Sequence, residues 1–200
     1  MNINNKIIFI HIPKTAGWGI GRRLRELDLL PPKGKGGAPY GHCHRFARDI
    51  ILEEHSHLPI MTVVRNPYDR LYSVHQFYSK MRADIPANLS FKDFILSFKE
   101  KWLGSAEKFH PCYDFITSID GQILATDILS FHNLEADYDS FCTKYAISNT
   151  LIQQNSNPRK QTNIDFKSLY SSEMREVVEE VFQKDLETFK FSYEQFLELH

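Results

Sequence analysis

The sequence predicts an α/β fold in which a central parallel sheet is flanked by helices. Two short apolar runs, Ile7–Ile10 and Ile60–Val64, have the continuous hydrophobicity of strands that are buried on both faces. A loop and then a stretch with helical periodicity follow each run. Strands that alternate with helices in this way are typical of a parallel sheet. Because 200 residues suit one domain of this kind, we expect residues 1–200 to form a single domain.

The helix behind the first strand is indicated by its apolar face. Hydrophobic residues recur at helical spacing at Ile20, Leu24 and Leu27. A loop rich in glycine and proline at residues 31–41 then separates this helix from a second helical stretch, over about residues 45–55.

The helix behind the second strand has a clear beginning in the sequence. Asn66 is a good N-cap, and Pro67 suits the first helical position. The apolar face of this helix is expected to carry Leu71, Val74 and Tyr78.

Elements in the second half of the chain are less sharply marked. Residues 90–118 have a mostly helical pattern, and Asp120-Gly121 between two apolar runs indicates a β-hairpin. A short helix is expected around residues 138–145. The last helix should run from about residue 173 to 189, because apolar residues begin there at i, i+3, i+4, i+7 and i+8.

Composition excludes several classes of function. The formal net charge is −1, so the chain as a whole is not built to coat nucleic acid or an anionic membrane. Its three cysteines, Cys43, Cys112 and Cys142, are too widely spaced to suggest a disulfide framework or a zinc site. Neither a secretory segment nor a transmembrane run is found. We therefore expect a cytoplasmic protein with no nucleic-acid partner.

The loop after the first strand has the features of an anion site. It reads Pro-Lys-Thr-Ala-Gly at residues 13–17 and stands between a buried strand and a helix N-terminus. Free backbone N–H groups and the helix dipole favour negative charge there, and Lys14 and Thr15 add a charge and a hydroxyl. The pattern is not Walker A, in which the lysine comes late in the loop. From the loop alone, a plain turn with a solvated Lys14 remains an equal alternative.

A second cation stands where the second strand enters its helix. Arg65 can present a planar fork of donors to a phosphate, and Ser73 lies on the same helical face as Asn66. Taken singly, Arg65 is better read as an ion-pair partner of Asp69, and Ser73 as a surface hydroxyl. Two strand–loop–helix junctions, each with its own cation, favour instead a ligand with phosphates at both ends.

The segments F-I-H-I-P-K-T-A-G and V-V-R-N-P-Y-D-R-L-Y-S resemble the two phosphate motifs of sulfotransferases that use 3′-phosphoadenosine-5′-phosphosulfate (PAPS). The closest resemblance is to the carbohydrate branch that contains heparan sulfate 2-O-sulfotransferase, and weaker similarity follows in family order along nearly the whole chain. It implies a P-loop-like sulfotransferase fold and transfer of a sulfuryl group to a hydroxyl, with a saccharide as the acceptor. It also implies which residues bind PAPS: Lys14, Thr15, Ala16, Gly17, Trp18, Gly19, Arg65 and Ser73.

The chain departs from the family immediately after the loop glycine. The family usually has Ser or Thr there, whereas this chain has Trp18 and Gly19. The change removes hydroxyls expected on the 5′-phosphate, although backbone N–H groups can still serve and Gly19 permits close approach. We expect Trp18 to pack in the core rather than to stack on the acceptor, since tryptophan is mostly buried.

The resemblance also implies a catalytic base. In the related branch a His follows Gly in the segment after the first helix, and residues 40–44 read Tyr-Gly-His-Cys-His here. His42 fits that pattern best and His44 is the second choice, since a histidine suits removal of the hydroxyl proton. Lys14 would stabilise the leaving oxygen. Metal binding by the H-x-H pairs at residues 42–44 and 55–57 is a weak alternative, and no metal is expected.

A basic loop near the C-terminal end completes the expected site. Related sulfotransferases often close such a loop over the 3′-phosphate, and Arg159 and Lys160 can do so here. A solvated basic turn is an equal alternative.

Two other functions remain open. One is a non-catalytic module that binds an adenosine bisphosphate, which the departure at Trp18 and Gly19 makes possible. The other, a phosphoryl transferase, is less favoured because the sequence shows neither a Walker loop nor carboxylates arranged for Mg²⁺.

Overall fold

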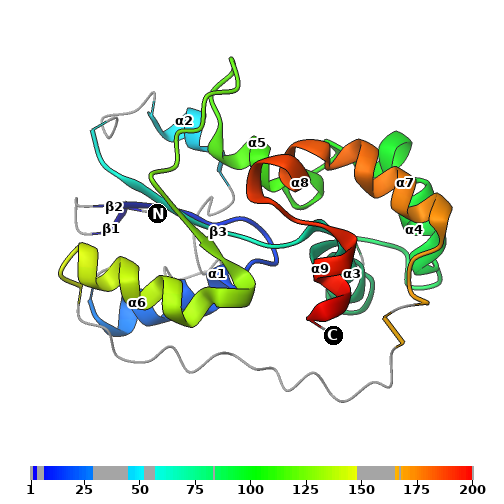
Figure 1. Ribbon diagram of the computed structural model, residues 1–200, viewed down its shortest axis with the longest axis horizontal. Helices are drawn as coiled ribbons and strands as arrows, with labels where there is room; N and C mark the ends of the chain where they lie inside the picture. Colours follow the sequence, from blue (N-terminus) through cyan, green and yellow to red (C-terminus); the bar gives the residue numbers. More distant parts are fainter. Residues whose placement is uncertain are drawn as a thin grey trace. The chain divides into compact units, whose positions relative to one another are not determined.

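The computed structural model describes residues 2–3, 7–28, 45–51, 57–82, 84–147, 165–166 and 168–199 (Figure 1). Its strands are β1 (Asn2–Ile3), β2 (Ile7–Ile10), β3 (Ile60–Val64) and β4 (Asp127–Ser130). Its α-helices are α1 (Gly17–Glu26), α2 (Ala47–Ile51), α3 (Pro67–Phe77), α4 (Phe91–Leu96), α5 (Cys112–Ile116), α6 (Leu134–Lys144), α7 (Ser172–Val181), α8 (Gln183–Phe189) and α9 (Tyr193–Glu198). Two π-helical turns, η1 (Tyr78–Arg82) and η2 (Phe98–Trp102), and two 3₁₀ turns, η3 (Glu107–Phe109) and η4 (Phe131–Asn133), complete the described elements.

Two compact units are formed from alternating segments of the chain. The sheet unit comprises Met1–Val64 and Asp114–Pro158, and the helical unit comprises Arg65–Tyr113 and Arg159–His200. Each unit therefore needs two separate stretches of sequence. The expectation of a single domain over residues 1–200 stays a prediction.

All four described strands lie in one sheet of the sheet unit, in the order β1-β2-β3-β4. β2, β3 and β4 are parallel, with Phe9 opposite Met61 and Val63 opposite Leu129, whereas β1 is antiparallel to β2. The predicted α/β class and the parallel pairing of the first two strands are thus confirmed. The sequence did not predict β1 or β4, which are the edges of this sheet.

Helices α1 and α6 cover one face of the sheet (Figure 1). Alternate strand residues point to this face, so Phe9 and Val63 contact the same cluster as Ile20 and Leu24 of α1. Tyr138, from α6, completes it. Ile20 and Leu24 are fully buried, and burial of each stabilises the fold by about 2 kcal/mol.

The helical unit is built around an aromatic core. The ring of Phe94 packs against those of Phe98, Trp102 and Phe109, with centroids 5.5, 5.7 and 6.2 Å away. Aromatic pairs at these spacings add about 0.5–1.5 kcal/mol beyond the area that they bury. Ring packing therefore holds together residues 94–109, which lie within the stretch that the sequence predicts to be mostly helical.

Helix α3 begins as the sequence predicts. The Asn66 side chain accepts a hydrogen bond from the backbone N–H of Tyr68 at 3.1 Å, and Pro67 takes the first helical position. Such a cap is worth about 1 kcal/mol. Leu71 and Val74 are buried on the expected face.

A buried carboxylate ties two distant parts of the helical unit together. Asp185 of α8 is fully buried and accepts hydrogen bonds from the N–H groups of Cys112 and Tyr113, at 2.8 and 2.7 Å. The guanidinium of Arg70, also buried, donates to the carbonyl of His110 at 2.8 Å. Burial raises the pKa of the Cys112 thiol to about 12, so this cysteine is not a nucleophile.

Two sequence predictions need correction in detail. The predicted last helix is two helices, because Phe182 leaves helical geometry between α7 and α8. At the predicted hairpin the chain does turn, with Gly121 at φ 83°, but only one bridge forms, between Thr117 and Ile123. Across the described ranges, every helix is too short or too polar to cross a lipid bilayer.

Candidate functional site

The loop between β2 and α1 has an unusual backbone. Lys14 and Ala16 are left-handed, at φ 68° and 67°, and Thr15 between them is not. A non-glycine residue in the left-handed region costs on the order of 1–3 kcal/mol, and such strain concentrates at binding and catalytic sites. Alternation of backbone hand is the arrangement that turns successive N–H groups toward one concave side, where an anion is held.

Helix α1 has neither a side-chain cap nor an acidic first turn, whereas α6 and α8 lack only the side-chain cap. The N-cap of α1 is Ala16, which forms no side-chain cap bond, and its first turn contains no acidic residue. Side-chain caps and acidic first turns occur in α3, α4, α7 and α9, whose N-caps are Asn66, Ser90, Ser171 and Ser192. The first N–H groups of a helix have no partner within it. The start of α1 thus has no side-chain cap, and the positive end of the helix dipole favours an anion there.

The hydroxyl of Thr15 is used inside the loop. Thr15 is fully buried, and its Oγ1 donates to the carbonyl of Ile12 at 2.9 Å. This bond closes the turn and commits the hydroxyl proton. Thr15 stays a predicted phosphate contact. Because its hydroxyl proton is used inside the loop, the predicted contact is through its backbone N–H.

Gly17 is required by its contact with His11, which no sequence pattern predicts. A Cβ atom at residue 17 would lie 1.8 Å from Cδ2 and 2.3 Å from Nε2 of His11, which is buried. Glycine is thus needed because the imidazole packs directly against the first turn of α1. No sequence spacing signals this contact, since it depends on how the loop folds back.

Trp18 does not pack in the core. Its side chain is 46% exposed in the first turn of α1, so the expectation of a buried indole is wrong. Position 18 faces solvent here because Gly17, Ile20 and Leu24 form the buried face of the helix.

In the helical unit, Arg65 forms the ion pair that the sequence left as an alternative. Its Nε donates to Oδ2 of Asp69 at 2.7 Å, and the side chains are 7% and 1% exposed. Ser73 follows one turn later on α3 and is partly buried. Asp69 and Ser73 are four residues apart in α3, which puts them along one side of the helix, and Arg65 precedes the N-cap Asn66.

The predicted base and the predicted basic loop lie outside the described residues. His42 and His44 belong to residues 29–44, and Arg159 and Lys160 belong to residues 148–164, neither of which the structure describes. Within the described part of the chain, no three His, Cys, Asp or Glu side chains are grouped so as to hold a metal ion.

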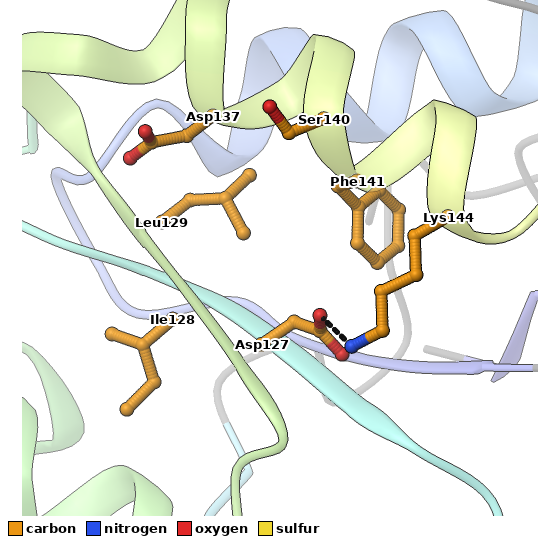
Figure 2. Close-up of a pocket in the computed structure, with 7 residues that line it drawn as sticks. All are labelled: Asp127, Ile128, Leu129, Asp137, Ser140, Phe141 and Lys144. Carbon is orange, nitrogen blue, oxygen red and sulfur yellow. Dashed lines mark hydrogen bonds and ion pairs between the residues drawn. The ribbon is translucent and has the colours of Figure 1, made fainter.

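An open depression of about 240 Å³ lies between β4 and α6, away from the loop residues that the sequence singled out (Figure 2). Asp127 and Lys144 meet at its rim, with Oδ1 and Nζ 2.6 Å apart. Burial acts to raise the pKa of Asp127, but hydrogen bonds from Lys144, Tyr145 and Thr126 together lower it. The Asp127 carboxylate thus accepts hydrogen bonds that join the end of α6 to the edge strand β4.

Comparison of the chain with models of known protein families, with curated proteins and with solved structures finds no match. The chain is therefore described by its own structure. It is a mixed α/β protein in which the helix after the first long strand has no side-chain cap and the loop before that helix contains a lysine.

Proposed function

We propose that this protein is a PAPS-dependent O-sulfotransferase with a saccharide acceptor and a P-loop-like sulfotransferase fold. One observation carries the proposal: the start of α1 is uncapped and follows a loop of alternating backbone hand at Lys14 and Ala16. An anionic phosphosulfate satisfies the N–H groups of such a junction, and Lys14 supplies the counter-charge.

The proposed reaction is an in-line displacement at sulfur. The acceptor oxygen attacks, a new S–O bond forms, and the bond between sulfur and the 5′-phosphate oxygen breaks. Lys14 and the loop N–H groups stabilise the charge that develops on the leaving oxygen. His42, or His44 in its place, takes the hydroxyl proton. The products are a sulfate ester and 3′-phosphoadenosine-5′-phosphate.

The far end of the nucleotide would be held by a different set of groups. The guanidinium of Arg65 suits paired hydrogen bonds to the 3′-phosphate, and Ser73 adds a hydroxyl. Arg159 and Lys160 would close over the same phosphate.

A non-catalytic module that binds the adenosine bisphosphate is the second candidate. It is favoured by Trp18, which stands where the related enzymes have a hydroxyl residue, and by Thr15, whose hydroxyl proton is already committed to the Ile12 carbonyl. Turnover separates the two functions, because a module binds the nucleotide and leaves PAPS intact.

The first test is ligand-induced stabilisation. A ligand that binds only the folded state raises the melting temperature, so 3′-phosphoadenosine-5′-phosphate should raise it more than ATP or AMP, which lack a 3′-phosphate. Equal shifts from the three nucleotides would contradict the proposal. The second test incubates labelled PAPS with a panel of saccharides and follows sulfate ester formation by mass spectrometry.

A further inference from the structure

The indole of Trp18 is exposed at the edge of the proposed anion site. The side chain is 46% exposed, although proteins bury most of their tryptophan surface. Trp18 is the second residue of α1 and follows Gly17 directly, so its backbone belongs to the junction at which the phosphosulfate is proposed to bind. Aromatic side chains are common in the lining of small-molecule sites, which makes the chemistry of this one relevant to the acceptor.

Helix geometry sets the direction in which the indole projects. In an α-helix each Cα–Cβ bond is tilted toward the N-terminus, so a side chain covers the turn that precedes its own Cα. Trp18 is in the first turn, and the chain before it is the loop that contains the left-handed Lys14 and Ala16. The indole therefore leans toward the loop end of α1 rather than along the helix.

The acceptor of the proposed reaction has to reach this junction from solvent. The loop N–H groups would hold the phosphosulfate at the start of α1. One side of the helix is closed by the core of the sheet unit, in which Ile20 and Leu24 are fully buried. The solvent side is the side on which Trp18 is exposed, so the indole lies where an acceptor would approach.

The face of an indole suits the ring of a pyranose. An aromatic face carries partial negative charge, and the ring of a pyranose presents C–H bonds of partial positive charge. Stacking of the two also removes apolar surface from water. Tryptophan supplies this contact area at a low cost in conformational entropy, because its side chain has only two rotatable bonds.

We propose that Trp18 selects the acceptor, by stacking its exposed indole on a pyranose ring while its backbone remains part of the phosphosulfate loop. The inference rests on the proposed function and deepens it, since it names a pyranoside as the acceptor class. The departure from the sulfotransferase pattern at residue 18 is then a change of role: a hydroxyl for the nucleotide is replaced by an aromatic surface for the sugar.

Steady-state kinetics with cellobiose, lactose and chitobiose as acceptors separates the two substrates. Trp18→Ala should raise the acceptor KM about tenfold or more, because the stacking contact is lost. It should leave kcat and the KM for PAPS within about twofold, because stacking is equally strong before and during the transfer. Trp18→Phe, which keeps a smaller aromatic face, should have an intermediate acceptor KM. Since the indole is exposed, both variants are expected to fold.

Fluorescence provides a second readout that does not need turnover. The chain has two tryptophans, and the other, Trp102, packs against Phe94 and Phe109 in the helical unit. In protein saturated with 3′-phosphoadenosine-5′-phosphate, a disaccharide that is sulfated should shift the emission to shorter wavelength, because it excludes water from the exposed indole. Sorbitol has similar hydroxyls but no ring, and it should cause no shift. Trp18→Phe should abolish the shift.

Ile123→Ala is the matched control. Ile123 is 47% exposed in the same unit, and it precedes β4, which β3 separates from β2. The variant removes exposed apolar surface away from the loop and should leave both KM values unchanged.

The outcomes distinguish the inference from the function on which it rests. If the wild-type protein sulfates none of the three disaccharides, the proposed function with a saccharide acceptor is overturned. If sulfation occurs and Trp18→Ala retains the wild-type acceptor KM, the role of Trp18 alone is overturned. An equal rise in the KM for PAPS would also overturn it, since the indole would then serve the nucleotide.

Discussion

The imidazole of His11 occupies the space that any side chain at Gly17 would need. A Cβ at residue 17 would lie 1.8 Å from Cδ2 and 2.5 Å from Cγ of that ring, so rotation of the ring tip alone does not relieve the overlap. The end of β2 and the start of α1 are in this way fitted to each other through one pair of residues.

Gly17→Ala should therefore destabilise the protein by about 1–3 kcal/mol, the usual cost of overpacking. Urea denaturation measures this loss. The same substitution in a His11→Ala background should cost much less, because the ring is gone, and the coupling between the two sites is read from the double-mutant cycle. Additive losses in the double variant would show that the two residues do not compete for this space.

Lys14→Ala should reduce the turnover number of the sulfuryl transfer about a hundredfold or more, since its charge is needed most as the leaving oxygen becomes negative. Lys99→Ala is the control. Lys99 pairs with Glu180 on the surface, and removal of an exposed pair changes little. A folded Lys14→Ala protein with an unchanged turnover number would exclude the proposed role.

His42→Ala should reduce turnover about a hundredfold to ten-thousandfold, the range for a lost general base. The wild-type rate should rise with pH through the histidine pKa, and the variant should lack that rise, while PAPS binding changes little. His44→Ala is the comparison. If only His44→Ala has these effects, His44 is the base; if neither variant does, the base is another group.

His75 should make stability fall in mildly acidic solution. Burial lowers its pKa, the hydrogen bond to the Leu89 carbonyl opposes the shift, and Lys80 adds to it. Nε2 donates to that carbonyl at 2.9 Å, and the buried Nδ1 has no hydrogen-bond partner within the described residues, so the ring has no place for a second proton. Because the folded pKa lies below the unfolded value of about 6.5, the unfolded state binds more protons below that pH.

The stability contributed by neutral His75 is thus present above about pH 6.5 and decreases as the pH falls below it. Urea midpoints measured at several pH values should fall more steeply in wild-type protein than in His75→Gln. Parallel curves for the two proteins would mean that other groups account for the acid sensitivity.

Local signals predicted the parts of the fold that local chemistry determines. Asn66 and Pro67 mark the start of α3 because capping and proline geometry act within a few residues. β4 gave no such signal: its sequence, Asp-Ile-Leu-Ser, is short and partly exposed, and only pairing with β3 makes it a strand. The break at Phe182 was missed for a similar reason, since the apolar spacing continues into α8.

Sequence patterns located the candidate loop but not its detail. Lys14 was identified from its place between a strand and a helix. The left-handed backbone of Ala16 and the close approach of His11 to Gly17 depend on the folded loop and have no pattern of their own. Trp18 was misjudged because average burial of tryptophan says nothing of which helical face a given one occupies.

The alternation of the two units along the chain also constrains how the protein is made. During synthesis, residues 65–113 leave the ribosome before the segment that contains Asp185. The N–H groups of Cys112 and Tyr113 are 73 and 72 residues away in sequence from Asp185, their acceptor, so these hydrogen bonds form only after that segment has been made. Contacts of such long range slow folding. Neither unit can be expressed as one uninterrupted fragment, and a deletion near the C-terminal end would expose the core of a segment translated much earlier.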